Sequence, residues 1–456
     1  MARSATKDLT RGSSIKQILG FMIPLVFGLI FQQMYGMVDS MVVGRTLGVN
    51  ALAGVGSTGS LNYFIVGFCT GTASGFAIPI AKKFGEGDYD GLRRFVGNII
   101  WLSSIFSIIL AALTVVFCDN ILTFMDTPED VFSYAYGYIV VIFAGIPITV
   151  AYNVLAGIIR SLGDSRSPVV FLMISGVLNV FLDLLFILVF DMGVVGASLA
   201  TIISQLVSAL LCLILIIKRF DILRLTRSDL RPNAGYIGTL CGMGFPMGLQ
   251  CSLTAIGSLV LQTSINNLGS VYVAATTASA KVQAIFNCPF EAMGTTMATF
   301  AGQNLGAGKI GRIRRGYREA CIIGTVYSVL SFGMVCLFGK SILVLFIDNP
   351  TEQLVGLTQQ NFVITSAFYI FLMLVFVTRL LIQGLGYTKI AMVAGIFEMV
   401  ARAFVGLVLV PNFGYIGACF SGPLAWILAT AFLVPMYIVI IKRLRDKQRH
   451  HTLNLN

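Results

Sequence analysis

Long apolar stretches separated by short polar connections run along almost the whole chain. About twelve of them reach the ~20 residues that a helix needs to cross the hydrocarbon core of a bilayer. Their approximate extents are 17–43, 51–80, 95–118, 132–158, 168–190, 194–217, 236–264, 271–301, 317–339, 354–383, 388–411 and 415–441. Because several are longer than required, tilted or bent helices are expected. The pattern predicts an all-α polytopic membrane protein.

Composition supports this fold class and excludes a nucleic-acid partner. Of the 456 residues, 57% are hydrophobic and 11% charged, whereas a soluble domain carries about 25% charged residues. The net charge of +11 lies in the connections between apolar stretches and not on one face, so it indicates membrane topology rather than a nucleic-acid surface.

The placement of Lys and Arg predicts the orientation. They concentrate before residue 17, in the second, fourth, sixth and eighth connections, and after residue 441, whereas the third connection holds Asp119, Glu129 and Asp130. Cytoplasmic connections are rich in Lys and Arg. We therefore expect a multi-pass protein of the plasma (inner) membrane with both termini in the cytoplasm. The glycine-rich basic connections 85–94 and 306–315 are expected to meet anionic lipid headgroups.

Four sequence marks recur in the same order about 222 positions apart. They are Pro24 with Pro246, Gly85 with Gly306, Gly163 with Gly386, and Gly193 with Gly414. This repeat predicts two lobes of six spans each, with an N-lobe at 1–217, a linker at 218–235, a C-lobe at 236–441 and a tail at 442–456. Parallel repeats of this kind are typical of transporters that alternate access around a central site; the alternative is a structural duplication without transport.

Two polar residues interrupt the apolar stretch 171–190. Asn179 and Asp183 are four positions apart, so they share one face of a helix. A carboxylate near the middle of a bilayer costs roughly 2.5–3.5 kcal/mol on insertion scales, and it therefore marks a functional site by default. The alternative is a hydrogen bond that joins two helices.

Other polar positions inside apolar stretches lie in the second half of the chain. Gln283, Asn287 and Glu291 form a stripe at intervals of four, for which substrate binding and helix–helix hydrogen bonding are both open. Glu398 and Arg402 are also four apart and can neutralise each other, which favours a structural role. Arg379 is a competing partner for Glu398.

Several motifs resemble those of the multidrug and toxic compound extrusion (MATE) family. Residues 32–39 (QQMYGMVD) and 48–56 (GVNALAGVG) resemble its first-span signature, and residues 157–164 and 300–308 agree with later family motifs. The resemblance covers about residues 15–441. It implies a V-shaped bundle of twelve helices in two lobes that exports organic cations or other amphiphiles in exchange for inward Na⁺ or H⁺.

The resemblance also implies a cation-coupling site in the N-lobe. Its matching residues are Asp39, the Asn179 and Asp183 pair, and the softer matches Tyr138, Asn153 and Thr201. The acid that the family carries in its seventh span is missing, because residues 247–254 contain no carboxylate, and the tenth span also lacks one. This argues against a C-lobe site of that kind and for a bacterial, DinF-like branch.

The chemistry of these residues leaves the coupling ion open. Two carboxylates that face one low-dielectric cavity repel each other, so one of them is expected to hold a proton. The same oxygens could instead ligate Na⁺ at Asp39, Asn179 and Asp183, with Thr201 as a further donor. The expectation is H⁺ or Na⁺ as coupling ion and no other cofactor.

Two other functions fit the sequence less well. A flippase of lipid-linked saccharides needs in-span basic residues; Lys281, Arg379 and Arg402 are outnumbered by the in-span acids, which favours a cationic or amphiphilic small molecule as substrate. An enzyme is disfavoured, since the two histidines, His450 and His451, lie in the polar tail and no HExxH or GxSxG motif occurs. Nothing in the sequence demands more than a monomer.

Overall fold

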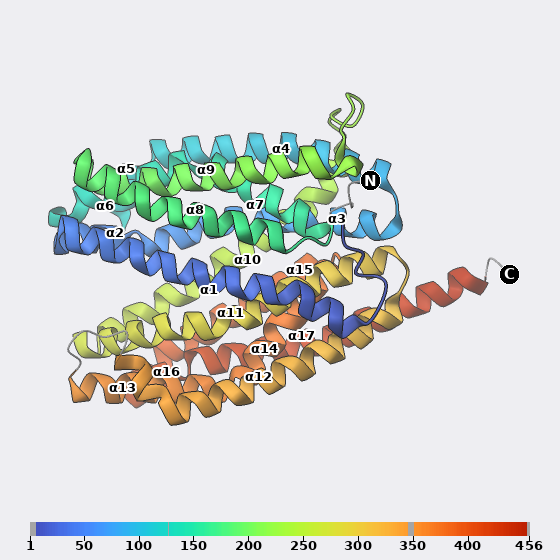
Figure 1. The fold of residues 1–456 in the computed structure, drawn as a ribbon. Helices are drawn as coiled ribbons and strands as arrows, with labels where there is room; N and C mark the ends of the chain where they lie inside the picture. Colours follow the sequence, from blue (N-terminus) through green and yellow to red (C-terminus); the bar gives the residue numbers. More distant parts are fainter. Residues whose placement is uncertain (1–5, 126, 345–350, 454–456) are drawn as a thin grey trace. The chain divides into compact units, whose positions relative to one another are not determined.

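Helices make up nearly all of the structure (Figure 1), a computed structural model that describes residues 6–125, 127–344 and 351–453. They are α1 (Ser14–Leu47), α2 (Val49–Ser57), α3 (Gly59–Glu86), α4 (Tyr89–Val116), α5 (Cys118–Phe124), α6 (Glu129–Ala144), α7 (Ile146–Ser161), α8 (Arg166–Leu184), α9 (Gly193–Arg219), α10 (Ala234–Asn266), α11 (Ser270–Gly306), α12 (Ile310–Val344), α13 (Glu352–Ala367), α14 (Tyr369–Gly384), α15 (Thr388–Phe404), α16 (Val410–Cys419) and α17 (Ser421–Leu453). The all-α expectation is confirmed, while residues 454–456 of the predicted tail lie outside the described part.

Eleven of the twelve expected spans pass a test of length and apolarity within the described residues. Nine are single helical segments, and two are pairs bent by 48° (α6 with α7) and 53° (α13 with α14). The eighth expected span, α11, has 37 residues but is not among them. Its many Thr, Ser, Gly, Gln and Asn residues lower its mean hydropathy. Polar residues therefore occur along the whole helix and not only at Gln283, Asn287 and Glu291.

The 48° bend between α6 and α7 falls at Gly145, whereas the 53° bend between α13 and α14 falls at Phe368, where neither proline nor glycine interrupts the span. Pro147 stands at the start of α7, directly after the 48° bend, where its missing N–H is tolerated. Pro24 lies inside α1 and Pro246 inside α10. Short π-helical turns at 185–189 and 405–409 continue α8 and α15.

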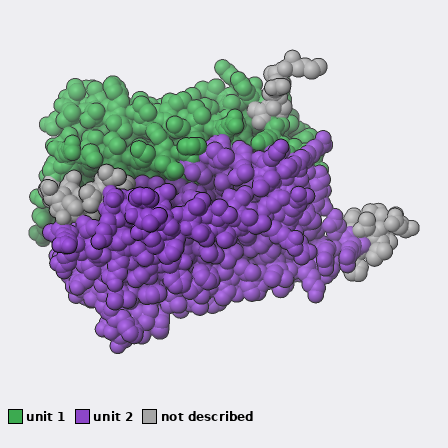
Figure 2. Space-filling model, turned by 60° about the horizontal axis from the view of Figure 1, so that its bottom comes forward, with its two compact units in different colours: residues 1–8, 27–252 green, residues 9–26, 253–456 purple. Residues whose placement is uncertain are grey.

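Packing divides the chain into two compact units, coloured separately in Figure 2. Unit 1 comprises residues 1–8 and 27–252, and unit 2 comprises 9–26 and 253–456. The boundaries therefore fall inside α1 and α10, and not in the linker between the repeats. The predicted lobes, 1–217 and 236–441, follow the sequence repeat and stay a prediction. The two units instead describe which parts of the chain pack together.

Glycines allow close helix contacts inside unit 1. A Cβ added at Gly75 of α3 would lie 2.6 Å from the Cα of Gly244 in α10, and one at Gly71 would lie 2.7 Å from the carbonyl oxygen of Met247. Small residues let backbones approach closely in membrane helices, where the hydrophobic effect does not drive association. These glycines thus hold the first part of α10 against α3.

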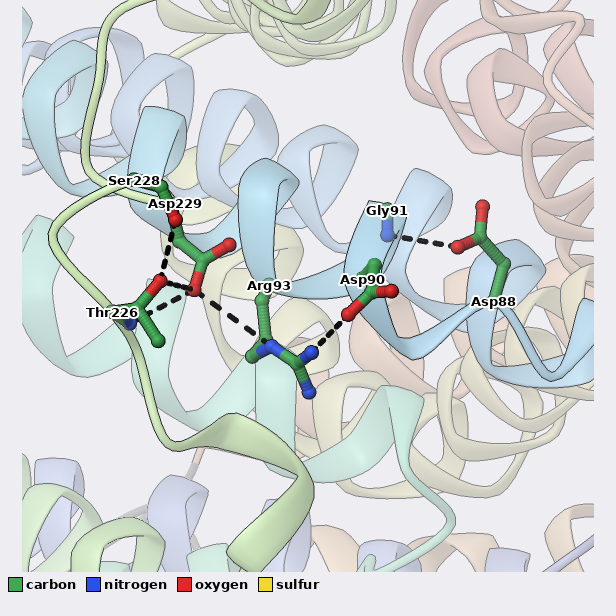
Figure 3. Close-up of polar contacts among 7 residues, drawn as sticks. All are labelled: Asp88, Asp90, Gly91, Arg93, Thr226, Ser228 and Asp229. Carbon is green, nitrogen blue, oxygen red and sulfur yellow. Dashed lines mark hydrogen bonds and ion pairs between the residues drawn. The ribbon is translucent and has the colours of Figure 1, made fainter.

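The segment that follows α9 folds back onto α4 within unit 1 (Figure 3). The Thr226 amide and hydroxyl donate to Asp229 Oδ2 over 2.8 and 2.7 Å. Arg93 of α4 lies between two carboxylates, in contact with Asp90 and with its Nε 3.7 Å from Asp229 Oδ2. Asp88 caps the same helix by accepting from the Gly91 amide.

Two further bonds fix this segment. The Asn233 amide donates to Asn98 Oδ1 over 2.8 Å, and Trp101 Nε1 donates to the Leu230 carbonyl over 2.8 Å. The predicted linker is thus a docked segment of unit 1.

Candidate functional site

Four helices of unit 1 position the predicted coupling residues. Asp39 lies on α1, Tyr138 on α6, Asn179 and Asp183 on α8, and Thr201 on α9. The Asp183 side chain is fully buried, Asn179 is 2% exposed, and Tyr138 is also buried, while Asp39 and Thr201 are half-buried. The one-turn spacing in α8 therefore does place an amide and a carboxylate on one inward face.

The two carboxyl groups of the site lie near each other. Asp39 and Asp183 interact electrostatically. When both are ionised neither can donate, and both oxygens of Asp183 and Oδ1 of Asp39 then lack a donor among the described residues. A buried acceptor without a donor costs about 1–3 kcal/mol. A shared proton or a bound cation would remove both this cost and the repulsion between the charges.

The amide of Asn179 completes a group of oxygens. Asn179 Nδ2 donates to Thr201 Oγ1 over 3.5 Å, and Thr201 Oγ1 donates to the Ala197 carbonyl. Asn179 Oδ1 is buried and receives no hydrogen bond from the described side chains or backbone. Carboxylate and amide oxygens suit a hard cation. Within the described chain no three His, Cys, Asp or Glu side chains group together for a metal, so a Na⁺ ion here would need amide and hydroxyl ligands.

Two tyrosines border the carboxylates. Tyr138 interacts electrostatically with Asp39 and Asp183, and Tyr35, one turn before Asp39 on α1, interacts with Asp39. Tyr35 was not among the predicted site residues, although its four-residue spacing from Asp39 is visible in the sequence. A buried hydroxyl on α9, Ser204, also has no partner in the described region and was missed.

Asn153 has a different local environment. Its Nδ2 donates to the Thr149 carbonyl one turn earlier in α7, and the Thr149 hydroxyl donates to Gln205 of α9 over 2.6 Å. The structure thus ties Asn153 to its own helix by this bond. Its predicted part in the coupling site stays a prediction.

The polar stripe of α11 lies in unit 2 and is mixed in character. Gln283 donates to Ser279 Oγ over 2.7 Å and to Asn361 Oδ1 over 3.0 Å, so it belongs to a network between α11 and α13. Asn287 Oδ1 is buried and has no donor among the described groups. Glu291 is exposed. Gln283 thus takes the helix–helix hydrogen-bonding role, while substrate binding by Asn287 and Glu291 stays a prediction.

The predicted pairing of Glu398 with Arg402 is not the ion pair that the structure shows. Glu398, 4% exposed, pairs with Arg379 of the neighbouring helix α14. Arg402 instead donates through Nη1 to the Thr254 carbonyl over 3.1 Å and to Ser258 Oγ over 2.8 Å, both on α10. Spacing along one helix could not decide between these partners, because the competing groups come from other helices.

Comparison with known proteins gives one consistent result. The family model described as MatE matches the chain twice, at residues 24–185 and 246–408. The chain is 28% identical over 383 residues to "Probable multidrug resistance protein YpnP" of Bacillus subtilis (strain 168), covering 83% of this chain and 84% of the relative. It is 27% identical over 357 residues to "Probable multidrug resistance protein YoeA" of the same strain, covering 76% of each.

A solved structure shares the fold. The "Crystal structure of MATE in complex with MaL6" superposes with a TM-score of 0.90 at 22% identity, covering 98% of this chain and all of the other. The two family matches begin 222 positions apart and end 223 apart, which confirms the internal repeat found in the sequence. We refer to 24–185 as the first repeat and to 246–408 as the second.

Proposed function

Since the chain belongs to the MatE family of multidrug transporters, we propose that it is a secondary active efflux transporter in which inward H⁺ or Na⁺ drives organic cations or amphiphilic drugs outward by alternating access. It is a multi-pass membrane protein. We propose the bacterial plasma membrane as its location, with both termini cytoplasmic, membrane lipid around it, and a monomer as the working form. The proposed branch is DinF-like, and no catalytic reaction is assigned.

One observation carries this proposal: the facing carboxyl groups of Asp39 and Asp183, with the buried Asn179 oxygen beside them. Four buried oxygens of these residues lack donors within the described chain, so the site is incomplete without a proton or a cation. A coupling site must also release its ion. Asp39 is half-buried while Asp183 is fully buried, which gives Asp39 the role of the accessible acceptor and Asp183 that of the inner one.

The neighbouring groups have supporting roles in this proposal. Thr201 orients the Asn179 amide by accepting from it. Tyr138 interacts electrostatically with both carboxyl groups and Tyr35 with that of Asp39. The site then alternates between an occupied form, in which a proton or Na⁺ offsets the repulsion, and an empty form, in which the two carboxylates separate.

The test uses everted membrane vesicles that contain wild-type protein, Asp39→Asn, Asp183→Asn or Asp119→Asn. Asp119 is an exposed carboxylate outside the site, so its amide variant is the matched control. We expect wild type and Asp119→Asn to move ethidium under an imposed pH gradient or an imposed Na⁺ gradient, and both site variants to lose this transport. Coupled transport that persists in Asp183→Asn would refute the assigned site.

The flippase of lipid-linked saccharides is the second candidate, and it rests on the in-span basic residues. Arg379 already has a carboxylate partner in Glu398, which weakens it as an anchor for a pyrophosphate. If the wild type moves no cationic dye from a broad panel under either gradient, the flippase becomes the better proposal.

A further inference from the structure

The start of α12 and the end of α17 lie together at one end of unit 2 (Figure 1). The rings of Tyr317 on α12 and Tyr437 on α17 stack with their centroids 4.1 Å apart. Farther along α17, Gln448 Nε2 donates over 2.6 Å to the carbonyl of Gly308, which lies in the turn before α12. Because α12 begins where α17 ends, the two helices are antiparallel neighbours from Tyr437 to Gln448.

Four arginines share one side of this helix pair. Since an α-helix turns by about 100° per residue, Arg314 and Arg318 are rotated by about 60° and 100° from the stacked tyrosine of α12. Arg445 and Arg449 are rotated by about 80° and 120° from the stacked tyrosine of α17. Because the helices run in opposite directions, these rotations turn all four side chains to the same side. All four are exposed, and we call them the arginine face.

The arginine face lacks the carboxylate partners that neutralise the corresponding arginine of the first repeat. Arg93 stands 221 positions before Arg314. It contacts Asp90, and its Nε lies 3.7 Å from Asp229 Oδ2. Within the described residues, no member of the arginine face takes part in an ion pair. The two repeats therefore differ in how much uncompensated positive charge they expose here.

The nearby carboxylates of unit 2 do not compensate this charge. Glu319 of α12 pairs with Arg315, with its Oε1 2.9 Å from Arg315 Nε. Asp446 of α17 is rotated by about 180° from Tyr437, so it lies on the far side of that helix. The arginine face is thus available to an anion that does not belong to the described protein.

A buried hydroxyl beside the arginine face also lacks a partner. Tyr437 is 6% exposed, and its hydroxyl oxygen is buried without a hydrogen-bonding partner in the part of the chain that the structure describes. Buried polar groups are nearly always paired, so this hydroxyl calls for a ligand. Arg314 and Arg318 interact electrostatically with the same tyrosine. An anionic oxygen there would accept from the hydroxyl and from guanidinium groups, which match phosphate geometry.

Apolar side chains on the same side identify the kind of anion. Ile322 of α12 is 65% exposed and Ile438 of α17 is 59% exposed. They are rotated by about 140° and 100° from the stacked tyrosines, to the side of the arginine face, and they lie nearer the middle of their spans. A ligand with a phosphate at the arginines and hydrocarbon against the isoleucines is a membrane lipid, whereas free phosphate would use the arginines alone.

We propose that the arginine face of unit 2 binds the phosphate of an anionic membrane lipid, with the Tyr437 hydroxyl as a further donor. Basic pockets between spanning helices bind anionic headgroups in this way. The sequence led us to expect lipid contacts at both basic connections, 85–94 and 306–315, whereas this inference assigns a defined site to the second. None of its residues belongs to the coupling site, so it is tested independently of the proposed function.

The test is native mass spectrometry of the full-length protein in detergent. The protein is titrated with phosphatidylglycerol or with phosphatidylcholine of the same acyl chains, and the bound fraction gives the affinity for each. We expect wild type to prefer phosphatidylglycerol by about tenfold or more, since each basic residue near an anionic headgroup contributes about fivefold. Equal affinities for the two lipids would overturn the proposal. Displacement of phosphatidylglycerol by an equal concentration of inorganic phosphate would overturn the assignment of a lipid as the ligand.

Matched double variants separate a built site from general attraction to a basic protein. Arg314→Gln combined with Arg445→Gln should weaken phosphatidylglycerol binding by about thirtyfold, or about fivefold for each charge removed. Arg443→Gln combined with Lys447→Gln is the control, because it removes two exposed charges from the other side of α17, and it should bind nearly as wild type does. Equal losses in the two double variants would overturn the proposal.

Two further variants test the charge and the hydroxyl separately. Arg314→Lys combined with Arg445→Lys keeps both charges on exposed positions, so it should retain most of the binding and the preference for phosphatidylglycerol. Tyr437→Phe removes only the hydroxyl, and we expect it to weaken binding of phosphatidylglycerol severalfold. Loss of the lipid preference in the lysine variant would contradict an electrostatic site, and unchanged binding by Tyr437→Phe would remove the hydroxyl from it.

Discussion

Removing one partner of the buried ion pair between Arg379 and Glu398 should strongly destabilise unit 2. The side chains are 12% and 5% exposed, and they join α14 to α15. Removing one partner of such a pair leaves an uncompensated buried charge, which costs about 3–5 kcal/mol, whereas replacing both by apolar groups of similar volume is often neutral or stabilising. Arg379→Met is therefore expected to lower the free energy of unfolding by about 3–5 kcal/mol. Arg379→Met combined with Glu398→Leu should recover most of that loss.

The assay is a double-mutant cycle on detergent-solubilised protein. The free energy of unfolding is measured by denaturant titration for wild type, each single variant and the double variant. Because the residues are in contact, their coupling energy should exceed the 0.5 kcal/mol or so that separates additive from interacting sites. Arg379 has interactions beyond Glu398, so its single variant is expected to be the more destabilised of the two. Additive single effects, or an Arg379→Met loss below about 1 kcal/mol, would refute the assignment of a desolvated pair.

Two smaller perturbations test the packing and the docked linker of unit 1. Gly75→Ala should destabilise by about 1–3 kcal/mol, because the new methyl group would meet the backbone at Gly244. Gly238→Ala on α10 is the control, because a Cβ there meets nothing within 4 Å, and it should stabilise the protein slightly. Equal changes in melting temperature for Gly75→Ala and Gly238→Ala would contradict this prediction. Burial alone would raise the pKa of Asp229, but hydrogen bonds from Thr226 and the nearby Arg93 and Arg94 outweigh it, and they hold that pKa below its usual value. Its contribution to stability is therefore present above the unfolded pKa of about 3.9 and is lost as the pH falls through the lower folded value. The melting temperature of Asp229→Asn should lie below that of wild type at pH 7, and the difference should shrink as the pH falls below about 4. A difference that is constant with pH would contradict this linkage.

The fold was predictable from sequence because a bilayer imposes its length and apolarity on each span. The expected span boundaries match the observed helices closely in α8 and α9, where apolar residues predominate from end to end. The apolar pattern did not reveal the two boundaries between the packing units, which lie inside α1 and α10. Hydropathy reports only whether a segment is in the membrane, and it does not say which neighbouring helices the segment packs against.

The candidate site was predictable where its residues share a helix and unpredictable where they do not. The pair Asn179 and Asp183 followed from a one-turn spacing, whereas Asp39 was connected to them only through the resemblance to a family. The predicted pairing of Glu398 with Arg402 is wrong for the same reason: a four-residue spacing offers Arg402, but the structure brings Arg379 from another helix. Charge partners inside a bundle depend on tertiary contacts that local spacing cannot contain.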